Sequence, residues 1–282
     1  MTRKLTAIFI ISIAGLCLLQ CLDKKKEIRL EIKYRPGLQL EWRCRLHETG
    51  TRYENGAPVR EIDNGREYTM VEKVLDMVDS VTARLRSTSY YTAYRTDPAD
   101  SSRTINYPDS VVYVYLQDNR GCCRFRAEDN PGLGTRMEYL ERINEQLAPM
   151  YPKENVGEGF TWNNRVRILL AEDAVTELVT TYRVRSFVRE AGYDCLVIEY
   201  EGTTIVPFQS TPDSPAPTAV GLDRSTFKGV YYFAYRKGFI VKLNENYEFE
   251  TEGTRFAEDG KTDYIIKKKG VFSYSLIKAD GA

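Results

Sequence analysis

Cysteines carry the most evident chemistry in this sequence. Cys21 closes an apolar N-terminal segment, and Cys44, Cys122, Cys123 and Cys195 are spread over the rest of the chain. An even number of cysteines in an oxidising compartment is typical of disulfide bonds. Because neighbouring residues in a strand face opposite sides, at most one of Cys122 and Cys123 can point into the same core as Cys44. The sequence therefore leaves two interpretations: a disulfide from this adjacent pair to Cys44 or Cys195, or four buried thiols.

No catalytic or metal-binding motif accompanies these cysteines. His47 is the only histidine and lies outside any H-E-x-x-H sequence, and the chain has neither a G-x-S-x-G motif nor a phosphate-binding glycine loop. The acidic pairs Asp97 with Asp100 and Glu248 with Glu250 lack the alternating ligand order of a calcium loop. We therefore predict no catalytic residue, no metal and no cofactor. A hydrolase built from dispersed carboxylates is the less favoured alternative, since that geometry is set in three dimensions.

The first 21 residues have the order of an export signal. Arg3 and Lys4 precede a mostly apolar run from Leu5 to Leu19, and Cys21 follows at its end. This order predicts a bacterial lipoprotein with the lipid on Cys21. The protein would then lie in the cell envelope outside the cytoplasm, anchored to a membrane and either periplasmic or surface-facing. Residues 22–27 form a short basic linker.

Two other interpretations of this segment stay open, an uncleaved single-span anchor and ordinary cleaved secretion. The apolar run is short against the roughly 20 residues that a spanning helix needs. The basic cluster at 24–26 also fits a linker better than the outer flank of a spanning helix, because basic residues tend to stay on the cytoplasmic side.

Composition narrows the class of the remaining chain. The 40 Lys and Arg residues balance 40 Asp and Glu residues. The chain therefore lacks the basic excess that would indicate nucleic-acid binding. The 20 Tyr and 11 Phe residues favour half-buried strands. The length is sufficient for one large β domain or two small ones.

Alternation with a period of two dominates residues 28–280. From Leu40 to Leu46 apolar residues alternate with polar ones, which predicts a strand with His47 on its solvent face. Similar patterns predict strands over 68–78, 81–94, 111–116 and 122–125, and again after residue 160. Strands this close in sequence favour antiparallel pairing. The proline-containing segment 207–224 is predicted to be an exposed loop.

One segment has helical spacing instead. Four apolar residues recur at intervals of three and four between Thr135 and Leu147: Met137, Leu140, Ile143 and Leu147. An amphipathic helix over 135–148 needs a sheet to lie on, so the predicted fold class is mainly β with an α+β architecture. Residues 28–280 would form one domain around this helix, with an organisation into two lobes, 28–130 and 158–280, as an option.

Four turn-and-strand segments occur in an order known from one family. They are KYRPGLQLEWR (Lys33–Arg43), YPKENVGEGFTW (Tyr151–Trp162), GYDCLVIEYEG (Gly192–Gly202) and YYFAYRKGFIVK (Tyr231–Lys242). In this order they resemble a group of uncharacterised bacterial envelope lipoproteins. The resemblance implies a curved antiparallel sheet or half-barrel with helix cover, distantly similar to periplasmic lipoprotein carriers, whose concave face can hold an acyl chain. It carries over no catalytic residue.

Two functional hypotheses follow. The first is an envelope lipoprotein that binds a lipid or another apolar or amphipathic ligand without catalysis. The second is a tethered protein-interaction or scaffolding module that binds no ligand, with a partner that the sequence does not identify. A cavity lined by residues such as Tyr231, Phe233 and Tyr235 would favour the first, and a fully packed interior the second.

Overall fold

The computed structural model describes residues 26–91, 94–95, 104–105, 110–131, 150–171, 174–210, 219–257 and 260–281. Its strands are β1 (Ile28–Arg29), β2 (Gln39–Glu54), β3 (Ala57–Met77), β4 (Thr82–Tyr91), β5 (Tyr94–Arg95), β6 (Thr104–Ile105), β7 (Ser110–Asp118), β8 (Cys123–Phe125), β9 (Asn155–Val156), β10 (Thr161–Ala171), β11 (Ala174–Glu190), β12 (Tyr193–Ser210), β13 (Ala219–Ala234), β14 (Phe239–Ala257) and β15 (Gly260–Asp280).

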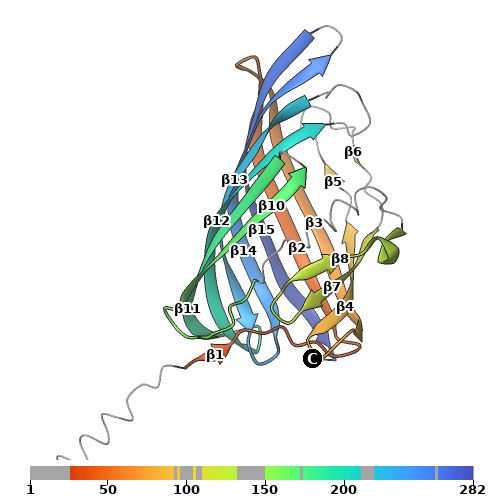
Figure 1. Ribbon diagram of the computed structural model, residues 1–282, viewed down its shortest axis with the longest axis vertical. Helices are drawn as coiled ribbons and strands as arrows, with labels where there is room; N and C mark the ends of the chain where they lie inside the picture. The colour runs from red at the N-terminus through yellow and green to blue at the C-terminus, as the bar shows by residue number, and fades with distance from the viewer. Residues whose placement is uncertain are drawn as a thin grey trace, which may run out of the picture.

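Eleven of these strands form one rolled antiparallel sheet, in the spatial order β10-β11-β12-β13-β14-β15-β2-β3-β4-β7-β8 (Figure 1). Two small ladders, β1 with β9 and β5 with β6, accompany it. The last strand β15 pairs with β2 from Tyr264 opposite Glu54 to Asp280 opposite Gln39. The sheet therefore continues without a break from the strands before residue 130 to those after residue 158.

The predicted α+β architecture is wrong, because the described chain is nearly all strand. Within the described residues the only helical element with both ends defined is a 3-10 turn, η1 (Ala127–Asp129). The segment 135–148, where a helix was predicted, lies outside the described residues. A sheet that rolls up packs its inner face against its own strands, so it does not need a helix to cover that face.

Alternation along the strands sets which side chains face inward. In β2, Trp42 and Cys44 are buried, whereas Arg43, Arg45 and His47 between and after them are exposed. The predicted strand with His47 on its solvent face is therefore confirmed. Most of the buried apolar side chains lie at one end of the strands, where the sheet packs against itself, although Val166 further along β10 is buried as well.

We call this end basal; it holds the turns at 78–81, 119–122 and 235–238 and lies at the bottom of Figure 1. Residues 26–38, here called the strap, cross the basal end and contribute β1 (Figure 1). The backbone N–H of Ile32 donates to Asn119 at 2.8 Å, and that of Lys33 donates to Gly238 at 3.3 Å. Leu30 is fully buried under the sheet. The strap therefore closes the basal end from below.

Two clusters of buried side chains fill the basal end. The first consists of Leu38, Leu40, Trp42, Cys44, Val74, Ala83, Leu85, Cys195, Ala234, Phe239 and Val241. The second consists of Leu30, Tyr151, Val156, Tyr182, Val184, Leu196, Ile198, Tyr231, Phe233 and Tyr235. The indole N–H of Trp42 on β2 donates to the carbonyl of Ile240 on β14 at 3.1 Å. Strands two places apart in the sheet thus meet across the rolled interior.

Further from the basal end, in what we call the upper part of the sheet, a tyrosine that lies over a glycine joins neighbouring strands. Tyr200 on β12 faces Gly229 on β13, which in turn faces Glu245 on β14. A Cβ atom at Gly229 would lie 2.6 Å from Cζ and Oη of Tyr200, so the tyrosine lies directly over the glycine. Its hydroxyl donates to Glu245 at 2.7 Å. One tyrosine therefore connects three strands across a glycine whose place no larger residue can take without displacing the ring.

The same arrangement recurs two strands along. Tyr247 on β14 lies over Gly270 on β15 and donates to Glu48 on β2 at 2.6 Å. Glycine inside a strand marks a close approach or a bend, and an aromatic ring lying over it restores the lost packing. We call these two arrangements tyrosine bridges.

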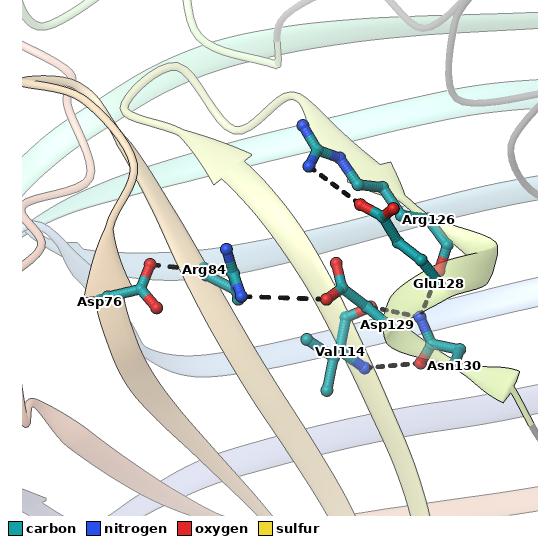
Figure 2. Close-up of polar contacts among 7 residues, drawn as sticks. All are labelled: Asp76, Arg84, Val114, Arg126, Glu128, Asp129 and Asn130. Atoms are coloured by element: carbon teal, nitrogen blue, oxygen red, sulfur yellow. Dashed lines mark hydrogen bonds and ion pairs between the residues drawn. The ribbon is translucent and has the colours of Figure 1, made fainter.

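The edge of the sheet beside β8 is protected by a side chain. β8 pairs with only part of β7, and the amide of Asn130 continues the pairing at Val114. The N–H of Val114 donates to Asn130 Oδ1 at 2.8 Å, and Asn130 Nδ2 donates to the carbonyl of Val114 at 2.7 Å (Figure 2). Arg84 lies between Asp76 and Asp129, at 3.8 and 3.9 Å (Figure 2). The N–H and C=O groups of Val114, which would otherwise be open to pairing with another chain, are therefore satisfied.

Candidate functional site

A partly open cavity of about 200 Å³ lies inside the basal end, between the two apolar clusters. Its walls come from the strap and from strands on both sides of the rolled sheet. Most of the wall is apolar, for example Leu40, Leu85 and Phe239. Ile32 and Tyr34 of the strap line it as well, so the strap forms part of the cavity wall. We call it the basal cavity.

A carboxyl group, Glu72 of β3, lines this apolar space. It sits in the inward register of β3, between Met70 and Val74, which also line the cavity. The Tyr115 hydroxyl on β7 donates to Glu72 Oε2. The second carboxyl oxygen has no hydrogen-bond partner among the described residues. Burial raises the pKa of Glu72, an effect that the Tyr115 hydrogen bond partly offsets.

Three further polar groups lie beside Glu72. The Tyr34 hydroxyl donates to Gln117 Oε1 at 2.7 Å, and Gln117 Nε2 donates to Cys123 Sγ at 2.9 Å. Burial raises the pKa of Tyr34, and it raises the pKa of Cys123 to about 12, with the Glu72 charge adding to both shifts. Both groups therefore keep their protons at neutral pH. We call Glu72, Tyr115, Gln117, Tyr34 and Cys123 the polar cluster.

This chemistry suits binding better than covalent catalysis. A nucleophilic cysteine needs a lowered pKa, and Cys123 has a raised one. Within the described part of the chain, no group of three or more His, Cys, Asp or Glu side chains is arranged to hold a metal ion. What the polar cluster offers is hydrogen-bond donors and acceptors at a fixed place in an apolar space.

The four cysteines considered for disulfide bonds lie in two different environments. Cys44 and Cys195 are buried in the first apolar cluster, and burial raises the pKa of each to about 11. Cys122 and Cys123 follow the β7–β8 turn, and only Cys123 belongs to the polar cluster. No disulfide joins these four described cysteines. Cys21 lies outside the described residues.

The other residues considered from the sequence lie away from the basal cavity. His47 is exposed, with Nε2 2.9 Å from Asp63. It lines a hollow of about 990 Å³ on the outer face of the sheet, together with Glu248. Glu250 pairs with Lys267 at 3.1 Å. Asp97 and Asp100 fall outside the described residues.

Sequence reasoning missed Glu72, although a signal was present. The inward positions in the basal half of β3 are Tyr68, Met70, Glu72 and Val74. A carboxyl group in an otherwise apolar register is the kind of buried polar residue that calls for an explanation. Tyr115, Gln117 and Tyr34 gave no such signal, because their meeting depends on how the strap and β7 fold against β3.

No helix among the described residues is long and apolar enough to cross a membrane.

Comparisons with known proteins place the chain in no family. No family model and no curated protein sequence matches it. A solved structure from Bacteroides fragilis, described as an exported protein with a YmcC-like fold, matches at 10% identity over 89% of this chain and 99% of that chain, with a TM-score of 0.29. A variant of the Rh. blastica porin matches at 9% identity over 85% of this chain and 99% of that chain, with a TM-score of 0.19. At TM-scores of this size, neither similarity assigns a fold or a function to this chain.

Proposed function

We propose that this protein is exported to the bacterial cell envelope, is held there by a lipid on Cys21, and binds a small amphipathic ligand in the basal cavity. The observation that carries the ligand proposal is a partly open, mainly apolar cavity that three members of the polar cluster line: Tyr34, Glu72 and Gln117. Small-molecule sites have this composition: apolar walls for affinity and a few polar groups for orientation.

The size of the basal cavity limits the ligand. Its volume of about 200 Å³ is below the roughly 300–1,000 Å³ of drug-sized sites. It exceeds the roughly 150 Å³ of an engineered apolar cavity that holds benzene. A small molecule, or one end of a longer amphiphile, therefore fits this space, and a whole phospholipid does not.

The free-energy cost of burying the polar cluster also supports a binding role. Apolar side chains in place of Glu72 and Tyr115 would avoid the desolvation of a carboxyl group. Among the described residues, only Tyr115 bonds to this carboxyl group, and it bonds to one of the two oxygens. A ligand that bonds to the other oxygen would offset part of the desolvation of the carboxyl group.

The proposed anchor places the basal end near the membrane. Lys26, the first described residue, lies at this end, with Nζ 4.3 Å from the ring centre of Phe187 and 4.5 Å from that of Tyr235. Cys21 precedes it by five residues, a length that spans at most about 18 Å. A ligand drawn from the membrane would thus meet the end of the sheet that contains the cavity.

Calorimetric titration of the exported protein, purified without detergent, with 1-hexanol tests the binding proposal. We expect saturable binding that Val74→Phe removes, because Val74 is 2% exposed and lines the basal cavity. Val112→Phe is the matched control, since Val112 is 46% exposed on β7, and it should bind as the wild type does. Circular dichroism and cooperative unfolding establish that each variant folds. Failure of the wild type to bind would favour a tethered interaction module without a ligand.

Cell fractionation of Cys21→Ala tests the anchor. We expect the domain to leave the membrane fraction, because the lipid acceptor is gone. Persistent membrane attachment with the signal uncut would instead indicate a spanning anchor and contradict lipidation.

A further inference from the structure

We infer that the ligand of the basal cavity carries a cationic nitrogen, an alkyl- or arylammonium group, and that Glu72 binds it. This inference rests on the proposed binding function and specifies the chemistry of the ligand's polar end. It is drawn from the carboxyl oxygens, from the charges around the cavity and from the aromatic lining.

The first observation is the geometry of Glu72. Tyr115 holds Oε2, which fixes the carboxyl group on the inner face of β3. The other oxygen belongs to a side chain that lines the basal cavity and has no further hydrogen-bond partner among the described residues. A fixed carboxyl oxygen of this kind accepts N–H or O–H donors of a ligand.

The second observation is the absence of a compensating positive charge. Of the described residues that line the basal cavity, none is Lys, Arg or His. No basic group contributes to the pKa shift of Glu72, and its negative charge raises the pKa of Tyr34, Tyr115 and Tyr274. Burial disfavours the ionised form of Glu72, and an entering cation would supply the counter-ion that favours it. A fatty acid or another anion would bring a negative charge to a site where no described lining residue is basic, and is disfavoured.

The third observation is the aromatic lining. Six of the lining residues carry aromatic rings: Tyr34, Trp42, Tyr151, Phe233, Phe239 and Tyr274. Aromatic rings attract ammonium groups, more strongly where water is excluded. The same end of the protein already contains such a contact, since Lys26 Nζ lies over the rings of Phe187 and Tyr235. An acidic oxygen among aromatic rings therefore selects a cation over a neutral or anionic group of equal size.

Three probes with the same six-carbon chain test this selection: hexylammonium, 1-hexanol and hexanoate, each titrated calorimetrically into the full-length exported protein at neutral pH. We expect the wild type to bind hexylammonium about tenfold more tightly than 1-hexanol, as one charge-assisted hydrogen bond provides, and hexanoate least. Glu72→Gln should lose this preference, because the amide carries no negative charge. Circular dichroism and cooperative unfolding establish that this variant folds.

Glu245→Gln is the matched control. Glu245 likewise accepts a tyrosine hydroxyl, from Tyr200 at 2.7 Å, but does not line the basal cavity, so this variant should keep the preference for hexylammonium. Equal binding of the three probes by the wild type, or an unchanged preference in Glu72→Gln, would overturn the inference and leave the binding function standing. Binding of no probe would overturn both.

Discussion

The basal and upper parts of the sheet are held together by different interactions. At the basal end, apolar side chains from both sides of the rolled sheet are removed from water, and Leu30, Leu196 and Phe233 are fully buried. Further up, the residues buried on the strands include Thr180 and Thr251. There the strands are joined across the inner face by the tyrosine bridges and other polar contacts. The sheet is one structure with two kinds of stabilisation.

This difference determines which buried or exposed carboxyl group indicates a functional site. In the upper part Glu252 is exposed beside Arg224 at 2.9 Å, an ordinary surface pair of small energetic value. At the basal end Glu72 lies in an apolar interior and has no basic partner among the described residues. A glutamate is therefore an ordinary surface residue in the upper part and the centre of the candidate site at the basal end.

The largest expected effect comes from truncating one basal and one upper side chain on the same strand, β12. Leu196 is fully buried, so Leu196→Ala should lower the free energy of unfolding by about 2–5 kcal/mol. Ile205 is 46% exposed, so Ile205→Ala should change it by less than about 1 kcal/mol. Urea denaturation followed by circular dichroism measures both. Equal losses would show that the upper part has an apolar core too, and the contrast drawn above would fail.

A smaller effect should come from a tyrosine bridge. A methyl group at Gly229 would lie 2.6 Å from Tyr200 and 2.7 Å from the carbonyl oxygen of Asn244. Gly229→Ala should therefore displace the Tyr200 ring from Glu245 and lower the free energy of unfolding by about 1–3 kcal/mol. Gly65→Ala on β3 is the control, because its methyl group would lie 3.8 Å or more from any neighbour. If Gly229→Ala were as harmless as the control in urea denaturation, the bridges would not stabilise the sheet.

The last prediction concerns the pH dependence of stability, which should have opposite signs in the two parts. Burial raises the pKa of Glu72 above the ordinary 4.5, so above that pH the unfolded chain binds fewer protons than the folded protein, and wild-type stability falls as pH rises. Glu72→Gln removes this titration. Its stability relative to wild type should therefore increase with pH, by up to about 1.4 kcal/mol per pH unit.

Glu252 should behave in the opposite way. Arg224 lowers the pKa of Glu252, so the stabilising charge is present at neutral pH and is lost as pH falls through the folded-state pKa. Glu252→Gln should then be destabilising at neutral pH and neutral in acid. Urea denaturation from pH 4 to pH 8 measures both variants. The same sign for the two variants would contradict the distinction between the basal and upper carboxyl groups.

The strand pattern was predictable from local sequence, but its boundaries were less so. Segment 207–224 was predicted as a loop, whereas β12 runs to Ser210 and β13 begins at Ala219. Pro207 pairs with Leu222 of β13, beyond the last partner that β11 offers to β12, at Ile205. A proline is tolerated in a strand where one side has no neighbour to accept its missing N–H bond. Composition alone does not reveal that local edge.

The sequence by itself determined which faces of the strands are exposed to solvent, because period-two alternation is a local property of each strand. His47 on the solvent face of β2 is the clearest example. The tertiary structure alone decided that β15 pairs with β2, that the sheet rolls up without a covering helix, and that Glu72 meets Tyr115 beside a cavity closed by the strap. These features join segments far apart in the chain, and their energy comes from removing both partners from water together, which no local pattern records.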